Sequence, residues 1–462
     1  MSDKSTKISA LVVTGITSFL APFMLSGVNI ILPSIQKEFS VNAVALNWIA
    51  SSSILATSVL LIPAGKLADI YGRKKIYVLG IIVFTISSFL CAFAGSIETL
   101  IILRMIQGTG SAMLITTGVA ILISIFPVKE RGSAIGINVA AIYLGLSAGP
   151  FIGGLINYYF SWKYIFLCIA PFGLTSIVLS ILFLKGEWAD AKGEKFDLIG
   201  SIIYGISLVM LMYGVSILPQ MKAFIMIISG CIGLVGFTAR EIKIGYPVFE
   251  VRLFRHNKIF LFSSLATLIN YASTFAITFL LSLYLQYILN MSSRKAGFVL
   301  VAQPIMQAII SPYAGRLSDR IEPAIIATIG MAINTIGLLL LAFLNPGISL
   351  AFIICVLIFL GFGYALFSSP NTNAIMSSVE KRHYGIASGS VATMRSIGMT
   401  LSMAITTIVF AINIGETEIT PAHYSEFESS VRIAFIIFAV LSAAGAVCSS
   451  ARGKLNRGNN NA

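Results

Sequence analysis

Fourteen long apolar runs divide this chain, and each is long enough to cross a lipid bilayer as an α-helix. About 20 apolar residues span the hydrocarbon core in helical form. A helix suits lipid because all of its backbone hydrogen bonds are internal. The runs lie near residues 8–32, 44–64, 76–95, 97–125, 132–157, 162–184, 198–217, 221–239, 259–288, 296–314, 324–344, 348–368, 384–414 and 430–450. This pattern predicts an all-α integral membrane protein with 14 transmembrane helices.

The composition supports the same fold class. Hydrophobic residues make up 57% of the 462 residues, and charged residues only 11%, against about 25% in soluble domains. The longest polar pieces, Lys185–Asp197, Ile244–Lys258 and Gly415–Ser429, are too short to form a soluble domain. The first run is longer than the apolar core of a signal peptide, so we expect it to be the first span. The five cysteines show no metal-ligand spacing, and we expect neither a metal nor a cofactor.

Basic residues are distributed unevenly between the two sides that 14 spans define. With the N-terminus inside, 23 of the 31 Lys and Arg residues fall in inner loops and six in outer loops. Inner loops of membrane proteins carry such an excess. We therefore expect a multi-pass protein of the cell (plasma) membrane with both termini in the cytoplasm. The net charge of +13 then faces the anionic inner leaflet, and no nucleic-acid partner is needed to explain it.

An internal repeat relates the two ends of the chain. GKLADIYGRKK (Gly65–Lys75) follows the second run, and AGRLSDRIEP (Ala314–Pro323) follows the tenth. Related halves that rock about a mid-membrane site are typical of secondary transporters. The repeat predicts a six-helix bundle (1–184), two inserted helices (185–250) and a second six-helix bundle (251–462). The candidate gating residues of the two copies are Gly65, Asp69, Gly72, Arg73, Lys74, Gly315, Asp319 and Arg320.

The repeated aspartates have a physical interpretation as latches. Asp69 lies at an inner helix end, where it can accept hydrogen bonds from Arg73 or from a neighbouring helix N-terminus. Such a pair can form in one conformation and break in the other. The alternative is that these charges only hold helices at the inner membrane surface.

Four motifs resemble those of one known family. GKLADIYGRKK, LIILRMIQGTGSA (Leu100–Ala112), GLSAGPFIGG (Gly145–Gly154) and SSPNTNAIMSS (Ser368–Ser378) resemble patterns of the major facilitator superfamily, in its fourteen-span drug:proton antiporter branch of the EmrB/QacA type. The resemblance covers essentially the whole chain. It implies a secondary transporter rather than an enzyme, with small molecules and protons as partners and one chain as the functional unit. The implied antiporter motif comprises Gly145, Gly149, Pro150, Gly153 and Gly154.

The fifth-span glycines are spaced three and four residues apart, on one helical face. Small residues allow the backbones of membrane helices to approach closely, and Pro150 allows a bend. Ordinary helix packing accounts for this pattern. A rocking interface that limits leak is the functional alternative, and that interpretation depends on the resemblance.

The first span departs from the pattern of the antiporter branch. The branch usually has an aspartate where Met24 stands in FMLSGVNIILP, whereas Asn29, Leu32 and Pro33 are kept. An acid within the membrane allows a cationic drug to bind and a proton to displace it. Its absence weakens the case for both cation binding and simple proton exchange.

Two arginines, Arg104 and Arg395, lie within spans, and none of the 18 acids does. A charge at that depth costs about 3 kcal/mol or more. Arg104, Gln107 and Arg395 are candidates for a proton relay or an anion site. Alternatively, Gln107 or backbone carbonyls satisfy Arg104, which then has a structural role. Candidates for lining a substrate cavity are Met24, Asn29, Asn138, Tyr143, Asn270, Gln303, Gln307, Asn371 and Asn373.

These observations favour a proton-linked exporter of small organic or amphipathic compounds. The alternative is an exporter of anionic or neutral metabolites or lipids, with the arginines as anion sites. A receptor or membrane enzyme is a remote third hypothesis, because the sequence shows no paired catalytic acids, nucleotide loop or sensory domain.

Overall fold

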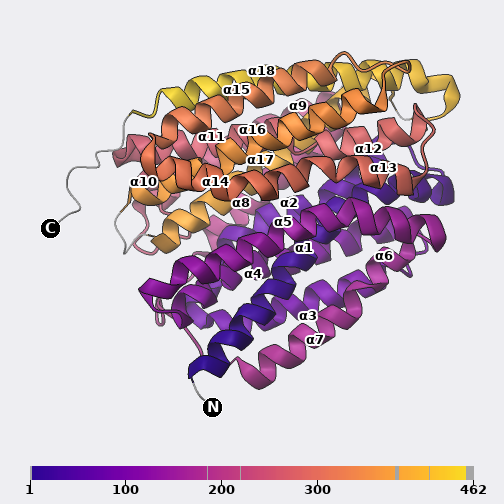
Figure 1. Ribbon diagram of the computed structural model, residues 1–462. Helices are drawn as coiled ribbons and strands as arrows, with labels where there is room; N and C mark the ends of the chain where they lie inside the picture. Colours follow the sequence, from indigo (N-terminus) through magenta and orange to yellow (C-terminus); the bar gives the residue numbers. More distant parts are fainter. Residues whose placement is uncertain (1–2, 185, 219, 380–383, 416, 454–462) are drawn as a thin grey trace.

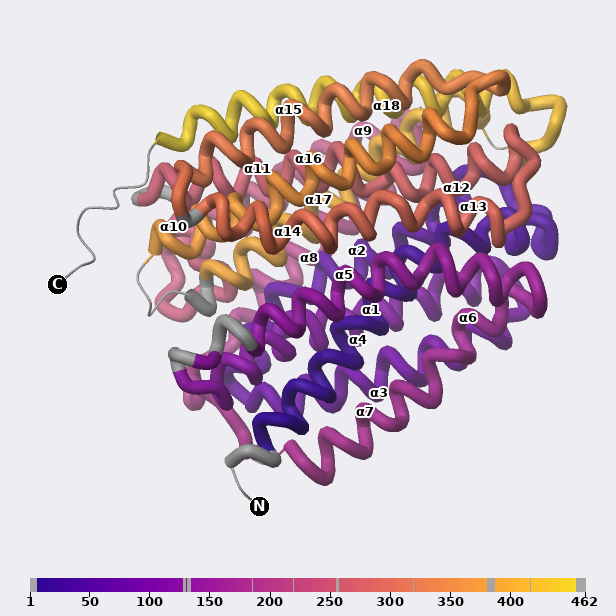
Figure 2. Tube along the Cα trace, viewed as in Figure 1, coloured from indigo at the N-terminus to yellow at the C-terminus, as the bar shows by residue number. Residues whose placement is uncertain are grey.

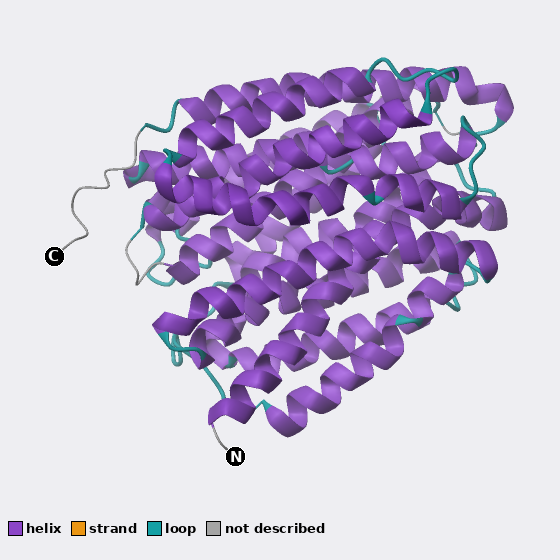
Figure 3. Cartoon of the chain, viewed as in Figure 1, coloured by secondary structure: helices purple, strands orange, loops and turns teal. Residues whose placement is uncertain are grey.

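Helices form all the regular structure in the described part of the chain, which comprises residues 3–184, 186–218, 220–379, 384–415 and 417–453 (Figure 3). The structure is a computed structural model. Several side chains within helices, including that of Asp319, lie outside the described part. The first helices are α1 (Asp3–Phe39), α2 (Ala43–Tyr71), α3 (Arg73–Cys91), α4 (Ile97–Ile125), α5 (Val128–Tyr159), α6 (Lys163–Leu167), α7 (Ile169–Phe183), α8 (Leu198–Ser216) and α9 (Met221–Lys243).

The remaining helices are α10 (Val251–His256), α11 (Lys258–Thr274), α12 (Ile277–Tyr287), α13 (Ser293–Leu300), α14 (Ala302–Arg320), α15 (Pro323–Leu341), α16 (Leu350–Ser377), α17 (Tyr384–Asn413) and α18 (Tyr424–Ser450), with the short 3-10 turn Pro421–His423 before the last. Fourteen helical segments among the described residues are long and apolar enough to span a membrane. This confirms the predicted fold class and span count.

Three spans consist of two shorter helices. They are α6–α7, α11–α12 and α13–α14. At the second break, the amide of Ala276 donates to Ser402 Oγ of α17 at 3.0 Å. A backbone group freed within the membrane needs such a partner, because lipid offers none. The break is therefore tolerated because it is buried in protein.

Polar residues at the loop ends of helices set several helix starts. The side chains of Asn42, Ser96, Asn257 and Ser349 each accept from the backbone amide three residues later. An N-cap of this kind satisfies one of the first amides, which have no partner within the helix. These residues mark where the apolar runs begin.

The helices form two groups that lie side by side (Figure 1). The first group packs α1 on α5, α2 and α3 on α4, and α3 on α7. The second group packs α14 and α15 on α16, and α11 on α17 and α18. The hairpin α8–α9 packs through α8 on α2 of the first group and α17 of the second. The start of α1 and the end of α18 lie at the same end of the molecule (Figure 2). The domain boundaries at 184 and 250 stay predictions.

Hydrogen bonds between described residues of the two groups lie mid-membrane and in the half that the basic-residue count assigns to the outside. Four side chains donate to carbonyls of the other group: Ser282 Oγ to Asn29 (2.7 Å), Gln286 Nε2 to Ile30 (3.0 Å), Asn47 Nδ2 to Met403 (3.4 Å) and Ser293 Oγ to Gly154 (3.2 Å). One bond joins two backbones, from the Ala43 amide to the Thr417 carbonyl (3.3 Å). The other bonds join side chains: Ser58 Oγ with Ser396 Oγ (2.6 Å) and Thr400 Oγ1 (2.8 Å), Tyr287 with Gln36, and Arg294 with Tyr159. These contacts hold the two groups together at the predicted extracellular end.

The inserted hairpin attaches at the seam between the groups. Tyr204 of α8 donates to the Ser58 carbonyl of α2 at 3.0 Å. The Ser58 hydroxyl in turn contacts Ser396 and Thr400 of α17. Ser58 of the first group therefore contacts both the hairpin and the second group.

The predicted orientation can be tested by thiol labelling. Lys192 and Asn345 are both exposed, and they lie in loops that the basic-residue count assigns to opposite sides. In a background without the five native cysteines, we expect Asn345→Cys to react with a membrane-impermeant maleimide in intact cells. Lys192→Cys should react only after permeabilisation. Labelling of Lys192→Cys in intact cells would overturn the assigned orientation.

Candidate functional site

Arg104 of α4 is bonded entirely to neutral groups. Its side chain is 1% exposed. The guanidinium donates to the Ile49 carbonyl (3.2 Å) and Ser53 Oγ (2.8 Å) of α2, and to Gln107 Oε1. Gln107 Nε2 donates to Ser88 Oγ of α3 at 2.6 Å. Arg104 and Gln107 therefore tie three helices together, as the structural alternative requires.

Arg395 of α17 has a different environment. Its guanidinium carbon lies 5.1 Å from the ring centroid of Tyr271 on α11, a cation–π contact. Tyr271 meets Tyr364 of α16 edge to face, with centroids 5.6 Å apart. Among the described residues, Arg395 Nε is buried without a hydrogen-bond partner. Tyr143 of α5 is close enough to act on Arg395 electrostatically. We call Arg395, Tyr271, Tyr364 and Tyr143 the arginine–tyrosine cluster.

The α2–α3 turn contains the expected ion pair. Arg73 donates to Asp69 Oδ1 through Nη2 (2.9 Å) and Nε (3.1 Å). Arg73 also donates to Ser124 Oγ of α4 (2.8 Å) and to Asp190 Oδ2 (2.6 Å). The arginine thus lies between two carboxylates, and the second comes from the loop between α7 and α8.

That loop packs closely on the turn, which the sequence did not lead us to expect. In segment 187–194, the Trp188 carbonyl accepts from the Arg73 amide (2.9 Å) and the Ala191 amide donates to the Asp69 carbonyl (2.9 Å). The Glu187 carboxylate accepts from the Lys74 amide (2.8 Å), and Lys66 Nζ donates to Glu194 Oε2 (2.6 Å). Basic residues of the motif face acids about 120 residues away in sequence, which no local pattern indicates.

Gly72 cannot be replaced in this arrangement. Its φ is +118°, a conformation that L side chains rarely adopt, and a Cβ there would lie 2.4 Å from the Glu187 carboxylate. Both the turn and the segment 187–194 therefore require glycine.

The second copy of the motif is less completely defined. Gly315 lies close to α16, because a Cβ there would be 2.9 Å from Ser369 Oγ. The side chain of Asp319 lies outside the described residues. Arg320 is exposed but has an interaction partner. A latch at Asp319 and Arg320 stays a prediction.

The fifth-span glycines face three different helices, α1, α6 and α13. A Cβ at Gly145 would lie 2.3 Å from the Phe19 carbonyl, and one at Gly149 would lie 2.0 Å from Ser26 Oγ, both on α1. Gly153 lies between α6 and α1, because a Cβ there would be 2.8 Å from Ile165 Cδ1 and 3.2 Å from Ile30 Cγ2.

Gly154 instead faces α13 of the second group, because a Cβ there would lie 2.5 Å from the Ser293 carbonyl. Nearby, a Cβ at Gly297 would lie 2.2 Å from the Pro150 carbonyl. The expected single face is therefore wrong for Gly154, since the helix turns by about 100° between consecutive residues. The motif packs α5 within its own group and also across the seam.

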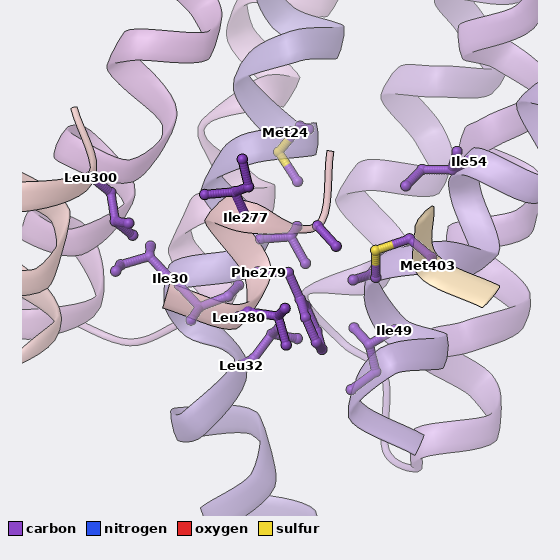
Figure 4. Close-up of a cluster of buried hydrophobic side chains, with 14 of the residues drawn as sticks. Met24, Ile30, Leu32, Ile49, Ile54, Ile277, Phe279, Leu280, Leu300 and Met403 are labelled. Carbon is purple, nitrogen blue, oxygen red and sulfur yellow. The ribbon is translucent and has the colours of Figure 1, made fainter. Parts of the chain in front are cut away.

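Met24 lies in an apolar cluster. Its side chain is 1% exposed. Figure 4 shows Met24 near Ile277 of α12, in a cluster that also contains Leu32 of α1 and Met403 of α17. Asn29 is buried nearby, and its carbonyl accepts from Ser282. The position where the antiporter branch has an acid is therefore dry and apolar in this conformation.

Other cavity candidates bond neighbouring helices. Asn270 Oδ1 accepts from Asn334 Nδ2 of α15 at 3.2 Å, and Asn373 Nδ2 donates to Ser318 Oγ of α14 at 2.9 Å. Gln303 and Gln307 on α14 are 8% and 6% exposed. Asn138 is buried, and its amide nitrogen has no hydrogen-bond partner among the described residues.

Asn371 of α16 pairs with Arg452, which lies just after the end of α18. Arg452 Nη1 donates to Asn371 Oδ1 (2.7 Å) and to Ser263 Oγ (3.2 Å), and Arg452 Nε donates to the Ser449 carbonyl (2.8 Å). Burial lowers the pKa of Arg452 to about 10, so it stays charged at neutral pH. Arg452 ties α11, α16 and α18 together at their inner ends.

The most buried acids among the described residues lie at the inner end of the inserted hairpin. Asp197 is 5% exposed and Glu241 is 1% exposed. Hydrogen bonds from Arg240 hold the pKa of Asp197 below its usual value. Glu241 Oε2 accepts from the Phe249 amide at 2.8 Å, while Oε1 has no hydrogen-bond partner among the described residues.

Comparisons with known proteins agree with this architecture. The family model described as "Major Facilitator Superfamily" matches residues 14–403 and 263–459. The chain is 30% identical to the riboflavin transporter RibZ of Clostridioides difficile, over 90% of this chain and 91% of that protein. It is also 30% identical to the multidrug resistance protein Stp of Mycobacterium tuberculosis, over 88% and 76%. A crystal structure of a bacterial homologue of the human lysosomal transporter Spinster, described as inward-facing and unoccupied, superposes with a TM-score of 0.70 at 16% identity over 98% of each chain.

Arg104→Gln tests the structural role of the buried arginine. The substitution leaves acceptors on α2 and α4 unpaired, and each unpaired buried group lowers the free energy of unfolding by about 1–3 kcal/mol. We expect a clear loss of thermal stability of the purified protein, and Arg104→Lys should not restore it, because Lys lacks the fork that reaches both helices. Arg432→Gln, at an exposed position, is the matched control. Unchanged stability in Arg104→Gln would contradict the role.

Gly149→Leu tests the packing of α5 on α1. Overpacking typically costs about 1–3 kcal/mol, and here the neighbour is backbone as well as Ser26. We expect no transport by the fraction of the variant protein that still folds and inserts into the membrane. Gly136→Leu on the same helix is the control, because a Cβ there meets nothing within 4 Å. Full activity in Gly149→Leu would mean that α1 and α5 separate at this point.

Asp69→Asn tests the latch. Asp69 is 41% exposed, so its pair with Arg73 should contribute less than about 1 kcal/mol to stability. We expect expression close to that of the parent but a severalfold lower transport rate, because Arg73 then keeps only one carboxylate partner, Asp190. Asp319→Asn should have a weaker effect, and Glu98→Gln, an exposed acid at the opposite end, should have none. Normal transport in both aspartate variants would refute the latch.

Proposed function

This chain belongs to the major facilitator superfamily, and from that membership we propose that it is a secondary active exporter of small organic or amphipathic compounds, driven by proton antiport. The family supports a transporter rather than an enzyme. We place the protein in the cell membrane with both termini in the cytoplasm. One chain contains both helix groups, so we infer that a single chain is the functional unit.

The observation that carries this proposal is how the two groups are joined. Their hydrogen bonds lie mid-membrane and at the predicted extracellular end, between side chains and backbone carbonyls of α1, α2, α5, α12, α13 and α17. Bonds of this kind contribute about 1 kcal/mol each, so they can break and re-form during a cycle. Rocking of one group against the other about a mid-membrane site is how such transporters move substrate.

The relatives agree with export. Stp is described as a multidrug resistance protein, and a further relative, 27% identical over 95% of this chain, is the cephamycin export protein CmcT of Amycolatopsis lactamdurans. RibZ, described as a riboflavin transporter, shows that a related chain handles a metabolite. Both substrate classes are therefore open to this chain.

A second candidate is export of anionic or neutral metabolites or lipids. It is favoured by Met24, which stands in an apolar cluster where the antiporter branch has an acid, and by Arg395. Arg104 is fully engaged with neutral groups, so Arg395 is the mid-span charge left to act on a substrate. A low dielectric strengthens its field.

Proton coupling then needs an acid outside the first span. Glu241 is the described acid most withdrawn from water, and Asp197 and Arg240 act on it electrostatically. It lies at the base of α9, which is paired with α8, and α8 contacts both groups at the seam. We infer that Glu241 is the first residue to test for proton coupling.

Uptake into inverted membrane vesicles tests the function. An imposed pH gradient, acidic inside, should drive accumulation of at least one compound from a panel of cationic, neutral and anionic fluorophores, and an ionophore should abolish it. Glu241→Gln should flatten the pH dependence of uptake, whereas Glu250→Gln should leave it unchanged. Uptake that ignores the gradient would refute antiport.

Met24→Asp separates the two substrate classes. A carboxylate at this apolar position is an unpaired buried charge, so we expect lower stability. In folded variant protein, we expect relative transport to shift from anionic toward cationic fluorophores. Met24→Leu, which conserves volume, should transport like the parent. Strong cation transport by the parent would favour ordinary multidrug export over the second candidate.

A further inference from the structure

We propose that the arginine–tyrosine cluster is the substrate site, and that it takes a planar aromatic compound bearing an anionic or carbonyl oxygen. This inference rests on the proposed function, because it names the substrate chemistry of the exporter. It concerns Arg395, Tyr271, Tyr364 and Tyr143, which lie on four different helices.

The first argument is an unused donor. Arg395 Nε is buried without a hydrogen-bond partner among the described residues. The guanidinium contacts Tyr271 through the ring face, and that contact leaves Nε without an acceptor. A buried donor without an acceptor destabilises the protein. An oxygen of a bound compound would supply the missing acceptor, and a negative charge on it would strengthen the bond.

The second argument is the contrast with the other buried arginines. Arg104 and Arg452 each donate to two groups on neighbouring helices and to a further acceptor three residues away in their own chain segment. Their charges are committed to holding helices together. Among the described residues, Arg395 Nε has no acceptor, although Arg395 also lies within an apolar span. Its environment therefore suits a residue that binds substrate better than one that holds helices together.

The third argument is the aromatic lining. Tyr271 and Tyr364 meet edge to face, and the partly exposed rings of Tyr364 and Tyr143 leave surface for a further contact. Aromatic pairs in offset or edge-to-face geometry stabilise a complex beyond the effect of the area that they bury. A flat ring system gains several such contacts at once, whereas an aliphatic chain gains none.

The fourth argument is position. Each of the four residues lies near the middle of its span. Arg395, Tyr271 and Tyr364 belong to the second group, and Tyr143 belongs to α5 of the first. A compound held between them touches both groups, so its binding responds to their relative movement. Among the described residues no acid lies at this depth, so a cation would meet the Arg395 charge without compensation.

Fluorescein and rhodamine 6G are matched probes, because both carry a planar xanthene ring system but have opposite charge. We would measure binding of each to the purified full-length protein in lipid nanodiscs by fluorescence anisotropy, without a pH gradient. We expect fluorescein to bind more tightly than rhodamine 6G. Arg395→Gln should weaken fluorescein binding at least about tenfold, as expected for a lost charge-assisted hydrogen bond.

Further variants keep the test decisive if Arg395→Gln does not fold. Arg395→Lys keeps the charge but loses the planar guanidinium, and should weaken binding about threefold. Tyr143→Ala, on the opposite group, should also weaken fluorescein binding. Tyr313→Ala, at a tyrosine that is 64% exposed, is the matched control and should bind as the parent does. Thermal melting confirms that each variant is folded.

Two outcomes would overturn the site. One is fluorescein binding that is unaffected by both Arg395 substitutions and by Tyr143→Ala. The other is rhodamine 6G binding more tightly than fluorescein. Because binding is measured at equilibrium, it is independent of transport. Fluorescein binding that depends on Arg395, without gradient-driven uptake, would refute the exporter and leave the site intact. Gradient-driven uptake that ignores Arg395 would refute the site alone.

Discussion

The hydrogen bonds of Arg104 are the interaction on which the first helix group depends. A charged side chain within the membrane must find its partners inside the protein, because lipid provides none. Arg104 meets this requirement with a carbonyl and a hydroxyl of α2 and with Gln107, which extends the network to α3. The same solution recurs at Arg452 with Asn371. Neutral acceptors on neighbouring helices therefore replace the counter-ion, and each arginine sets the spacing of the helices around it.

Arg395 differs, because its Nε has no acceptor among the described residues. This difference is why we propose it as a substrate-binding residue. A positive charge that the helices leave without acceptors is costly unless something else binds it. The ring face of Tyr271 provides partial compensation. Together with Met24 in place of an acid, the charge of Arg395 is the basis on which we propose electron-rich substrates rather than simple cations.

Close packing and the segment 187–194 define where the molecule can move. Gly145 and Gly149 bring α5 against α1, whereas Gly154 and Pro150 bring α5 against α13 across the seam. At the inner end, segment 187–194 connects the inserted hairpin to the turn that holds Asp69 and Arg73. Short, bonded connections therefore link the predicted latch to the inserted hairpin, which contacts the seam through α8.

The sequence by itself determined the fold class and the span count, because the need to bury backbone hydrogen bonds in lipid leaves only helices of a minimum length. It also predicted the pair Asp69–Arg73, which is four residues apart on one chain segment, and offered Gln107 as a partner for Arg104 at the same short range. Tertiary structure alone decided which residues that are distant in sequence lie next to one another. Asp190 and Glu187 reach the α2–α3 turn, Tyr364 reaches Tyr271, and Gly154 faces α13 rather than α1. Helical periodicity specifies a direction around one helix, but the neighbour in that direction is set by the packing of the whole bundle.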